Sequence, residues 1–192
     1  REKYLKFVED IDRSNISTIH KFAIGILRGE SLYTGLGTNF RITENEHKRG
    51  KTYDLFLGEF LEEKECENAN FVNELPIPIY DLKKKLMSIA DRLFDKSINL
   101  EQIKTSEMGV TVDNNIPYFN ELLTRVVFPA EELYLETLRD GNNIDLKESV
   151  IELEKILSGG CEKLKNLHLK YLFIDECQDT DDVQIEIFQK LQ

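Results

Sequence analysis

The sequence predicts a predominantly α-helical fold with two short strands, and three observations support this fold class. Apolar residues recur at helical spacing over most of the 192 residues. Only two stretches, residues 15–19 and 171–176, have the β-branched or continuously apolar character of strands. The run "YLFI" is apolar on both faces, which is typical of a strand inside a parallel sheet. Because two strands do not form a stable sheet alone, we expect its other strands to come from polypeptide outside this sequence.

The helices follow from periodicity and from their start and stop signals. In chain order they are expected over residues 4–11, 20–28, 43–61, 81–94, 117–139, 144–158 and 181–191. Thr43 and Glu46 have the spacing of a capping box, so the third helix is expected to open there. Pro129 predicts a kink or a break in the fifth. Residues 29–43, with several glycines, are expected to form an extended loop.

Composition and charge narrow the classes of function. With 41% hydrophobic residues the chain can bury a core, while a net charge of −11 argues against generic coating of nucleic acids. A narrow site with a few directed DNA contacts stays possible. Three widely spaced cysteines, Cys66, Cys161 and Cys177, fit no disulfide framework and indicate a reducing compartment. We therefore expect a cytoplasmic protein and, since the first residue is not Met, a piece of a longer one.

The segment "YLFIDECQDTDDVQ" contains the strongest functional signal. Its apolar run leads directly into Asp175 and Glu176, two adjacent carboxylates that repel each other. An apolar strand that ends in Asp-Glu and continues into a loop and helix has the form of a Walker B element of a P-loop NTPase. There, Mg²⁺ and a triphosphate would relieve the repulsion. The alternative is a solvated strand-to-helix turn with no ligand.

The letters that follow extend this signal to a family resemblance. "DECQDTDDVQ" resembles motif II of the UvrD/Rep/PcrA group of superfamily 1 DNA helicases. The matching residues are Asp175, Glu176, Gln178, Asp179, Thr180 and Gln184, while Asp181 replaces the usual Asn. "ISTIHKFAIGILR" is similar to motif Ic of the same group and matches it at Thr18, His20 and Phe22, with Lys21 in place of the usual Ser. "TGLGTNFRIT" is similar to the loop that follows motif Ic in these helicases.

The resemblance implies a fold and a division of the chain. Residues 1–24 and 166–192 would be pieces of a RecA-like P-loop α/β domain, and residues 25–165 an inserted helical subdomain. The chain would thus be a fragment that runs from motif Ic through motif II.

The resemblance also implies roles, with ATP and Mg²⁺ as cofactors and single-stranded DNA or single-strand/double-strand junctions as partners. Asp175 would bind Mg²⁺ through water, Glu176 would activate the hydrolytic water, and Gln178 would sense the γ-phosphate. Thr18, His20 and Phe22 would line the groove for single-stranded DNA, by phosphate contacts and base stacking. Simpler alternatives remain for this second set, since Thr18 can be a strand residue and Phe22 a core residue.

Other candidate features have ordinary explanations. The basic clusters at residues 47–51 and 83–85 could touch duplex DNA, but solvated helix faces in an acidic chain explain them equally well. Cys177 occupies the variable position of motif II and is interpreted as a space-filling residue.

The sequence lacks the P-loop string G-x-x-x-x-G-K-[ST] that cradles phosphates, and the arginine fingers of such enzymes come from later motifs. We therefore expect an ATP-dependent DNA helicase or translocase as the full protein, and an inactive isolated chain. A non-catalytic acidic helical module for protein–protein interaction is the alternative. Nothing in the residues separates a repair or replication-restart helicase from a recombination enzyme fused to a nuclease.

Overall fold

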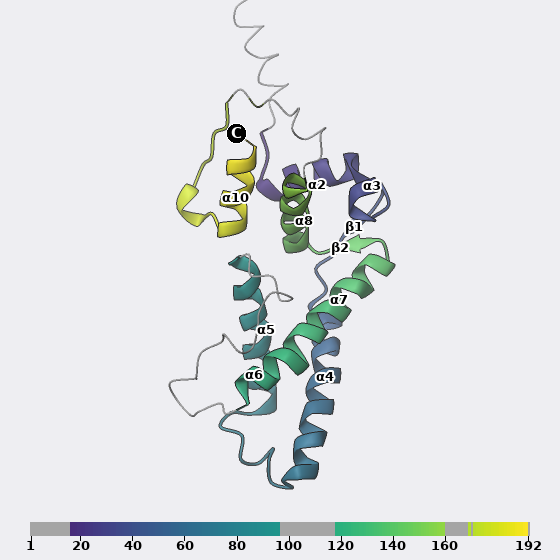
Figure 1. Cartoon of the computed structure of the whole chain (residues 1–192), viewed down its shortest axis with the longest axis vertical. Helices are drawn as coiled ribbons and strands as arrows, with labels where there is room; N and C mark the ends of the chain where they lie inside the picture. The colour runs from purple at the N-terminus through teal and green to yellow at the C-terminus, as the bar shows by residue number, and fades with distance from the viewer. Residues whose placement is uncertain (1–15, 97–117, 160–168, 170, 192) are drawn as a thin grey trace, which may run out of the picture.

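The computed structural model describes residues 16–96, 118–159, 169 and 171–191 (Figure 1). This part of the chain is mostly helical and has two short strands, which agrees with the predicted fold class. The elements are α2 (Ile19–Gly29), α3 (Ser31–Thr34), β1 (Arg41–Ile42), α4 (Glu46–Glu67), α5 (Ile79–Asp95), α6 (Phe119–Leu122), the π-helix η3 (Leu123–Val127), α7 (Phe128–Asp140), β2 (Asn143–Ile144), α8 (Leu146–Ser158), the 3₁₀-helix η4 (Cys177–Asp179) and α10 (Asp182–Lys190).

The two strands are not where the sequence analysis placed them. β1 pairs in parallel with β2, with Arg41 opposite Asn143 and Ile42 opposite Ile144. Residues 16–18 are irregular, and residues 171–174 follow no helix or strand pattern, with Phe173 89% exposed. A strand is stable only beside another strand, and the two-stranded sheet of the described residues does not extend to either stretch. Apolar character therefore predicted two strands, and the described residues contain two, but at other positions.

The start of α4 is a second correction. Asn45, not Thr43, is the N-cap, and its Oδ1 accepts a hydrogen bond from Lys48 N at 2.9 Å. The backbone N–H of Thr43 instead donates to Ile144 O at 3.0 Å, which prolongs the pairing of β1 with β2. The expected loop at residues 29–43 likewise contains α3 and β1.

A kink or a break was expected at Pro129, and the structure instead has a continuous helical run with a π-helical turn just before this residue. α6, η3 and α7 follow one another without a break in the chain, and the π-helical turn ends immediately before the first turn of α7, which holds Pro129. A proline inside a helix lacks a donor and crowds the carbonyl four residues earlier, so a locally widened helix relieves both problems. The other helices expected within the described residues are present, whereas the one expected at residues 4–11 lies outside them.

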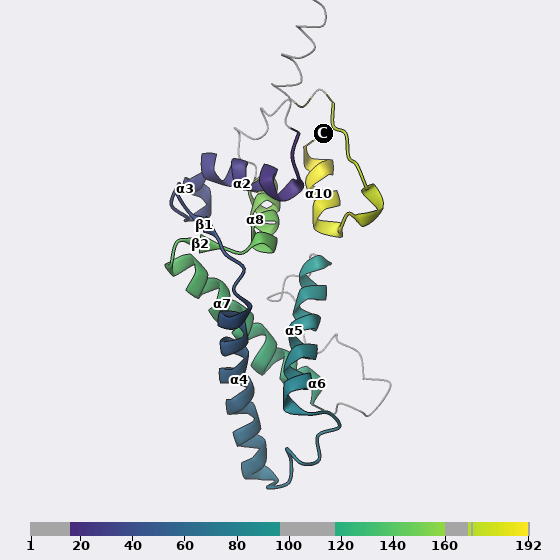
Figure 2. The same cartoon turned by 180° about the vertical axis from the view of Figure 1, so that it is seen from behind.

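The described elements form two bodies (Figures 1 and 2), and the buried side chains of each form clusters of their own. We call α4, α5, α6, η3 and α7 the helical body. We call α2, α3, β1, β2, α8 and α10 the motif body, since it carries both sequence motifs. The helical body is filled by apolar side chains of all its helices, among them Tyr53, Leu57, Phe60, Leu86, Val126 and Ala130. The motif body has two smaller clusters, one around Phe40 and Ile144 and the other around Leu153 and Ile187.

A buried ion-pair network lies at the end of the helical body that faces the motif body. Glu131 of α7 is 2% exposed, and its Oε1 accepts from Arg49 Nε at 2.8 Å and from Tyr53 Oη at 2.6 Å. Arg49 Nη1 also contacts Asp91 Oδ1 of α5 at 3.0 Å. The network thus fastens α4, α5 and α7 to one another.

Burial and the neighbouring negative charge of Glu131 raise the pKa of Tyr53 well above its usual range. Folding therefore opposes ionisation of this phenol, so its contribution to stability is complete below about pH 10 and is lost as the pH rises further. We expect the free energy of unfolding of Tyr53→Phe to fall less steeply above pH 10 than that of the wild type. The difference in slope should reach up to about 1.4 kcal/mol per pH unit. Urea unfolding at pH 8, 10 and 11 measures it, and parallel pH profiles for the two proteins would contradict the assignment.

Candidate functional site

The turn that carries Asp175, Glu176 and Gln178 is exposed and locally ordered. Glu176 adopts left-handed backbone angles (φ 49°, ψ 42°), which are uncommon for a residue other than glycine. Its N–H donates to Asp175 Oδ1 at 3.0 Å, and its carboxylate accepts from the Gln178 amide. η4 follows directly, with Asp179 N bonded to Glu176 O at 2.9 Å. The three predicted site residues are therefore brought together by one tight turn.

The end of the same motif fixes the start of α10. Asp181 is the N-cap, and its Oδ1 accepts from Gln184 N at 2.8 Å. Its Oδ2 accepts from Gln184 Nε2, also at 2.8 Å. An aspartate can cap a helix as well as the asparagine that is usual at this position, which explains why the departure from the motif is tolerated. Asp181 and Gln184 thus support the turn from its C-terminal side.

Thr18, His20 and Phe22 lie at the start of α2. Thr18 is the N-cap, with its Oγ1 accepting from Lys21 N at 3.3 Å. His20 and Phe22 are half-buried, and Phe22 packs against the cluster around Leu153 and Ile187. The packing of Phe22 gives it a core role in this structure; its role in DNA contact stays a prediction.

The structure brings the two motifs into one body. Helices α2 and α10 both pack on α8, and the cluster around Leu153 joins Ala23 of α2 to Val183 and Ile187 of α10. Figure 1 shows the three helices together in the same half of the molecule. Residues about 160 positions apart in the sequence are therefore held by a common set of side chains.

The chemistry of the turn suits a cation. Within the described residues no lysine, arginine or histidine pairs with Asp175, Glu176 or Asp179, so the carboxylates at this turn are not neutralised by side chains. No group of three potential ligand side chains is preassembled for a metal in that part of the chain. A single carboxylate with exposed oxygens fits the manner in which Mg²⁺ is held beside a nucleotide, where phosphates and water supply its other ligands. The residues present thus fit magnesium–nucleotide binding.

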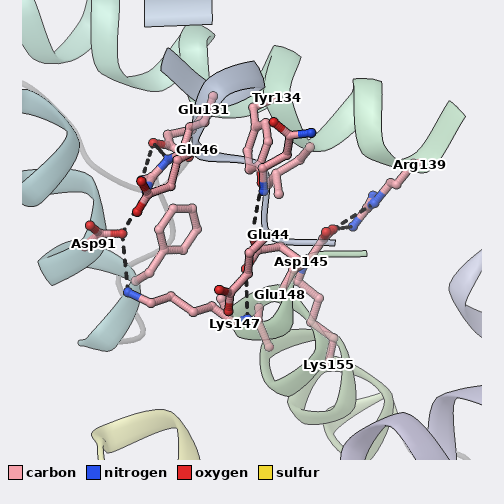
Figure 3. A pocket seen from close by; sticks show the side chains of 15 residues that line it. Glu44, Glu46, Asp91, Glu131, Tyr134, Arg139, Asp145, Lys147, Glu148 and Lys155 are labelled. Atoms are coloured by element: carbon pink, nitrogen blue, oxygen red, sulfur yellow. Dashed lines mark hydrogen bonds and ion pairs between the residues drawn. The ribbon is translucent and has the colours of Figure 1, made fainter. Parts of the chain in front are cut away.

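A separate cavity of about 270 Å³ lies between the two bodies (Figure 3). None of the six predicted site residues lines it. Its charged walls include the network of Arg49, Asp91 and Glu131. They also include Arg139, whose guanidinium contacts Glu148 Oε1 at 2.7 Å and Glu152 Oε1 at 2.8 Å.

The buried carboxylates Glu131 and Glu148 were not predicted from the sequence, although the position of Glu131 in its helix carried a signal. Glu131 lies four residues after Val127 and seven before Leu138, so it occupies a position on the apolar stripe of its helix. An acidic residue at such a position requires a partner, which here is Arg49. Burial lowers the pKa of the Arg49 guanidinium, but the nearby carboxylates of Glu131 and Asp91 together raise it by more, so this arginine stays charged.

Comparison with known families identifies one match over the whole chain. The family model described as the UvrD/REP helicase N-terminal domain matches residues 1–192. No curated protein and no solved structure matches the sequence. Among the described residues, no helix combines the length and the apolar character needed to cross a membrane.

Proposed function

This chain belongs to the family of UvrD/Rep helicase N-terminal domains, and from that premise we propose that it serves an ATP-dependent DNA helicase or translocase. In that enzyme, ATP hydrolysis would drive movement along single-stranded DNA and unwinding at single-strand/double-strand junctions. Residues 1–24 and 166–192 would contribute to the RecA-like domain, and residues 25–165 would be its helical insertion.

The observation that carries this proposal is that the exposed acidic turn directly follows an exposed apolar segment of the chain. Phe173 is 89% exposed and Ile174 39% exposed immediately before Asp175. Large apolar side chains gathered at one place are usually covered in the working protein. Neighbouring strands of a parallel sheet would cover these side chains and leave the carboxylates at the edge where ligands of such sheets bind.

Each residue of the turn then has a defined task. Asp175 would hold the water shell of Mg²⁺, and the metal would supply charge neutralisation to the phosphates. Glu176 would accept the proton of the attacking water, because its carboxylate is exposed and forms no ion pair with a lysine, arginine or histidine of the described residues. Gln178 donates to Glu176 in the structure, so it would orient that carboxylate as well as sense the γ-phosphate.

The DNA side of the proposal rests on α2. The hydroxyl of Thr18 and the imidazole of His20 can bond to phosphate oxygens, and the ring of Phe22 is only partly covered by the core. Cys66 and Cys177 are free thiols, as a protein of the reducing cytoplasm would have.

A comparison of two proteins tests the proposal. A longer polypeptide that contains this chain and a P-loop should hydrolyse ATP, and single-stranded DNA should stimulate it. The 192-residue chain alone should not, because its sequence contains no phosphate-cradling P-loop. Hydrolysis by the chain alone above that of its Glu176→Gln variant would overturn the expected inactivity. A longer polypeptide that fails to bind MgATP would overturn the helicase assignment and favour the acidic interaction module.

A further inference from the structure

The junction between the helical body and the motif body differs from the interior of either one. Each body has its own hydrophobic core, and no core cluster of the described residues includes side chains from both. We propose that the junction is a hinge at the β1–β2 pair, closed on the opposite side by a latch of exposed ion pairs centred on Lys96 and Lys147.

The hinge is where the chain passes between the bodies. β1 leads into α4, and α7 leads through β2 into α8, so the described chain crosses twice at the same place. The two strands are short, and their pairing includes Arg41 N bonded to Asn142 O at 3.1 Å. Asn142 has a positive φ of 51°, and its Oδ1 accepts from Gly37 N at 2.8 Å, which ties the crossing to the motif body. On the same side, Arg139 of α7 contacts Glu148 and Glu152 of α8, so the neck consists of the strand pair and these ion pairs. A neck this narrow permits rotation of one body against the other.

The latch lies at the C-terminal end of α5, away from this neck. Lys96 Nζ contacts Asp182 Oδ2 of α10 at 2.9 Å. Lys147 Nζ of α8 contacts Asp91 Oδ1 at 3.3 Å and Asp95 Oδ1 at 3.5 Å, both on α5. Figures 1 and 2 show the end of α5 facing α10 from either side. Lys96 belongs to the helical body and Lys147 to the motif body, so each body provides one cation to the latch.

The space beside the latch is open. The cavity of about 270 Å³ is lined by Phe94 and Leu135 of the helical body and by Ile151 of the motif body. Figure 3 shows Lys147 reaching across it to Asp91. Among the described residues, no shared hydrophobic core fills this space, so the bodies can separate here without disrupting one.

The latch pairs are suited to reversible opening. The side chain of Lys96 is 65% exposed and that of Asp182 is 50% exposed, and exposed pairs are weak and screened by salt. Asp182 is the first residue of α10, next to the Asp181 cap that ends the acidic turn. If the proposed function holds, opening the latch would therefore loosen the nucleotide-facing turn.

A distance measurement in the 192-residue chain tests the latch without nucleotide or DNA. Cys66 of α4 and Gln189→Cys of α10 are labelled with a fluorescence donor and acceptor, with Cys161 and Cys177 replaced by Ser; positions 66 and 189 are both exposed. At low salt, the double variant Lys96→Gln/Lys147→Gln should shift the population toward longer distances, with a roughly two- to fivefold higher ratio of open to closed molecules. Near 1 M salt the unmodified latch should open likewise, since the screening length falls to about 3 Å.

Matched variants separate the latch from general charge effects. Lys83→Gln/Lys190→Gln removes the same charge, but the pairs with Asp54 and Glu154 lie within one body each, so the distances should not change. Lys96→Arg/Lys147→Arg should keep the closed distances. An unchanged distribution in the Lys96→Gln/Lys147→Gln variant, or an equal shift in the control pair, would overturn the proposal. Because no nucleotide is involved, that result would leave the helicase proposal standing.

Discussion

Arg49→Leu is expected to lower the free energy of unfolding by about 3–5 kcal/mol, the cost of leaving a buried charge without its partner. Glu131 is 2% exposed, and two of the three hydrogen bonds to its Oε1 come from Arg49. The Tyr53 hydroxyl alone does not compensate the remaining negative charge. Urea or thermal unfolding followed by circular dichroism measures the loss, which is a large part of the stability of an ordinary domain.

Two further variants identify the cause of this loss. Arg49→Leu combined with Glu131→Leu should recover most of it, because the double replacement removes the unpaired charge. Lys83→Leu removes an exposed pair with Asp54 in the same body and should change stability by no more than about 1 kcal/mol. An Arg49→Leu protein as stable as the Lys83→Leu protein would show that the network is not needed for stability.

Glu176→Gln, introduced into the longer polypeptide, is expected to lower the rate of the proposed DNA-stimulated ATP hydrolysis by about 10²–10⁴-fold, the usual contribution of a general base. Glutamine has the shape of glutamate and keeps an oxygen that can accept from Gln178, but it cannot take the proton of the attacking water. MgATP affinity should change only slightly, since the proposal assigns the metal to Asp175. Steady-state hydrolysis and nucleotide titration measure the two effects.

Glu186→Gln is the matched control for that experiment. Glu186 is an exposed carboxylate on α10 whose ion-pair partner is Lys190, at 3.9 Å on the same helix. Its replacement should leave turnover unchanged. If Glu176→Gln retained normal turnover, or if the two variants lost activity equally, Glu176 would not be the base.

The helices could be predicted because their signal is local. Apolar residues of α5 and α8 recur every three or four positions, and this period exists whatever the rest of the chain does. The strands could not be predicted in this way, because a strand forms only where another strand lies beside it. Residues 171–174 have the apolar character of a strand without one beside them, whereas Asn143 pairs with Arg41 from a turn sequence that predicts no strand.

The candidate site likewise has a part that could be predicted from the sequence and a part that could not. Asp175, Glu176 and Gln178 were identified from their order in the sequence, and the family match over residues 1–192 confirms the resemblance. The packing of Phe22 against α8 and α10 depends on tertiary structure. The partner of Glu131 was likewise hidden, because Arg49 is 82 positions away.

The separate cores have a consequence for how this chain can vary. Phe60 and Leu86 belong to the core of the helical body and to neither cluster of the motif body, and the chain enters and leaves the helical body at adjacent strands. A substitution that disturbs the core of the helical body therefore leaves Leu153 and Ile187 with the same neighbours. Such a disturbance reaches the acidic turn through the contacts between the bodies, such as the crossing at Arg41 and Asn143 and the pair of Lys96 with Asp182.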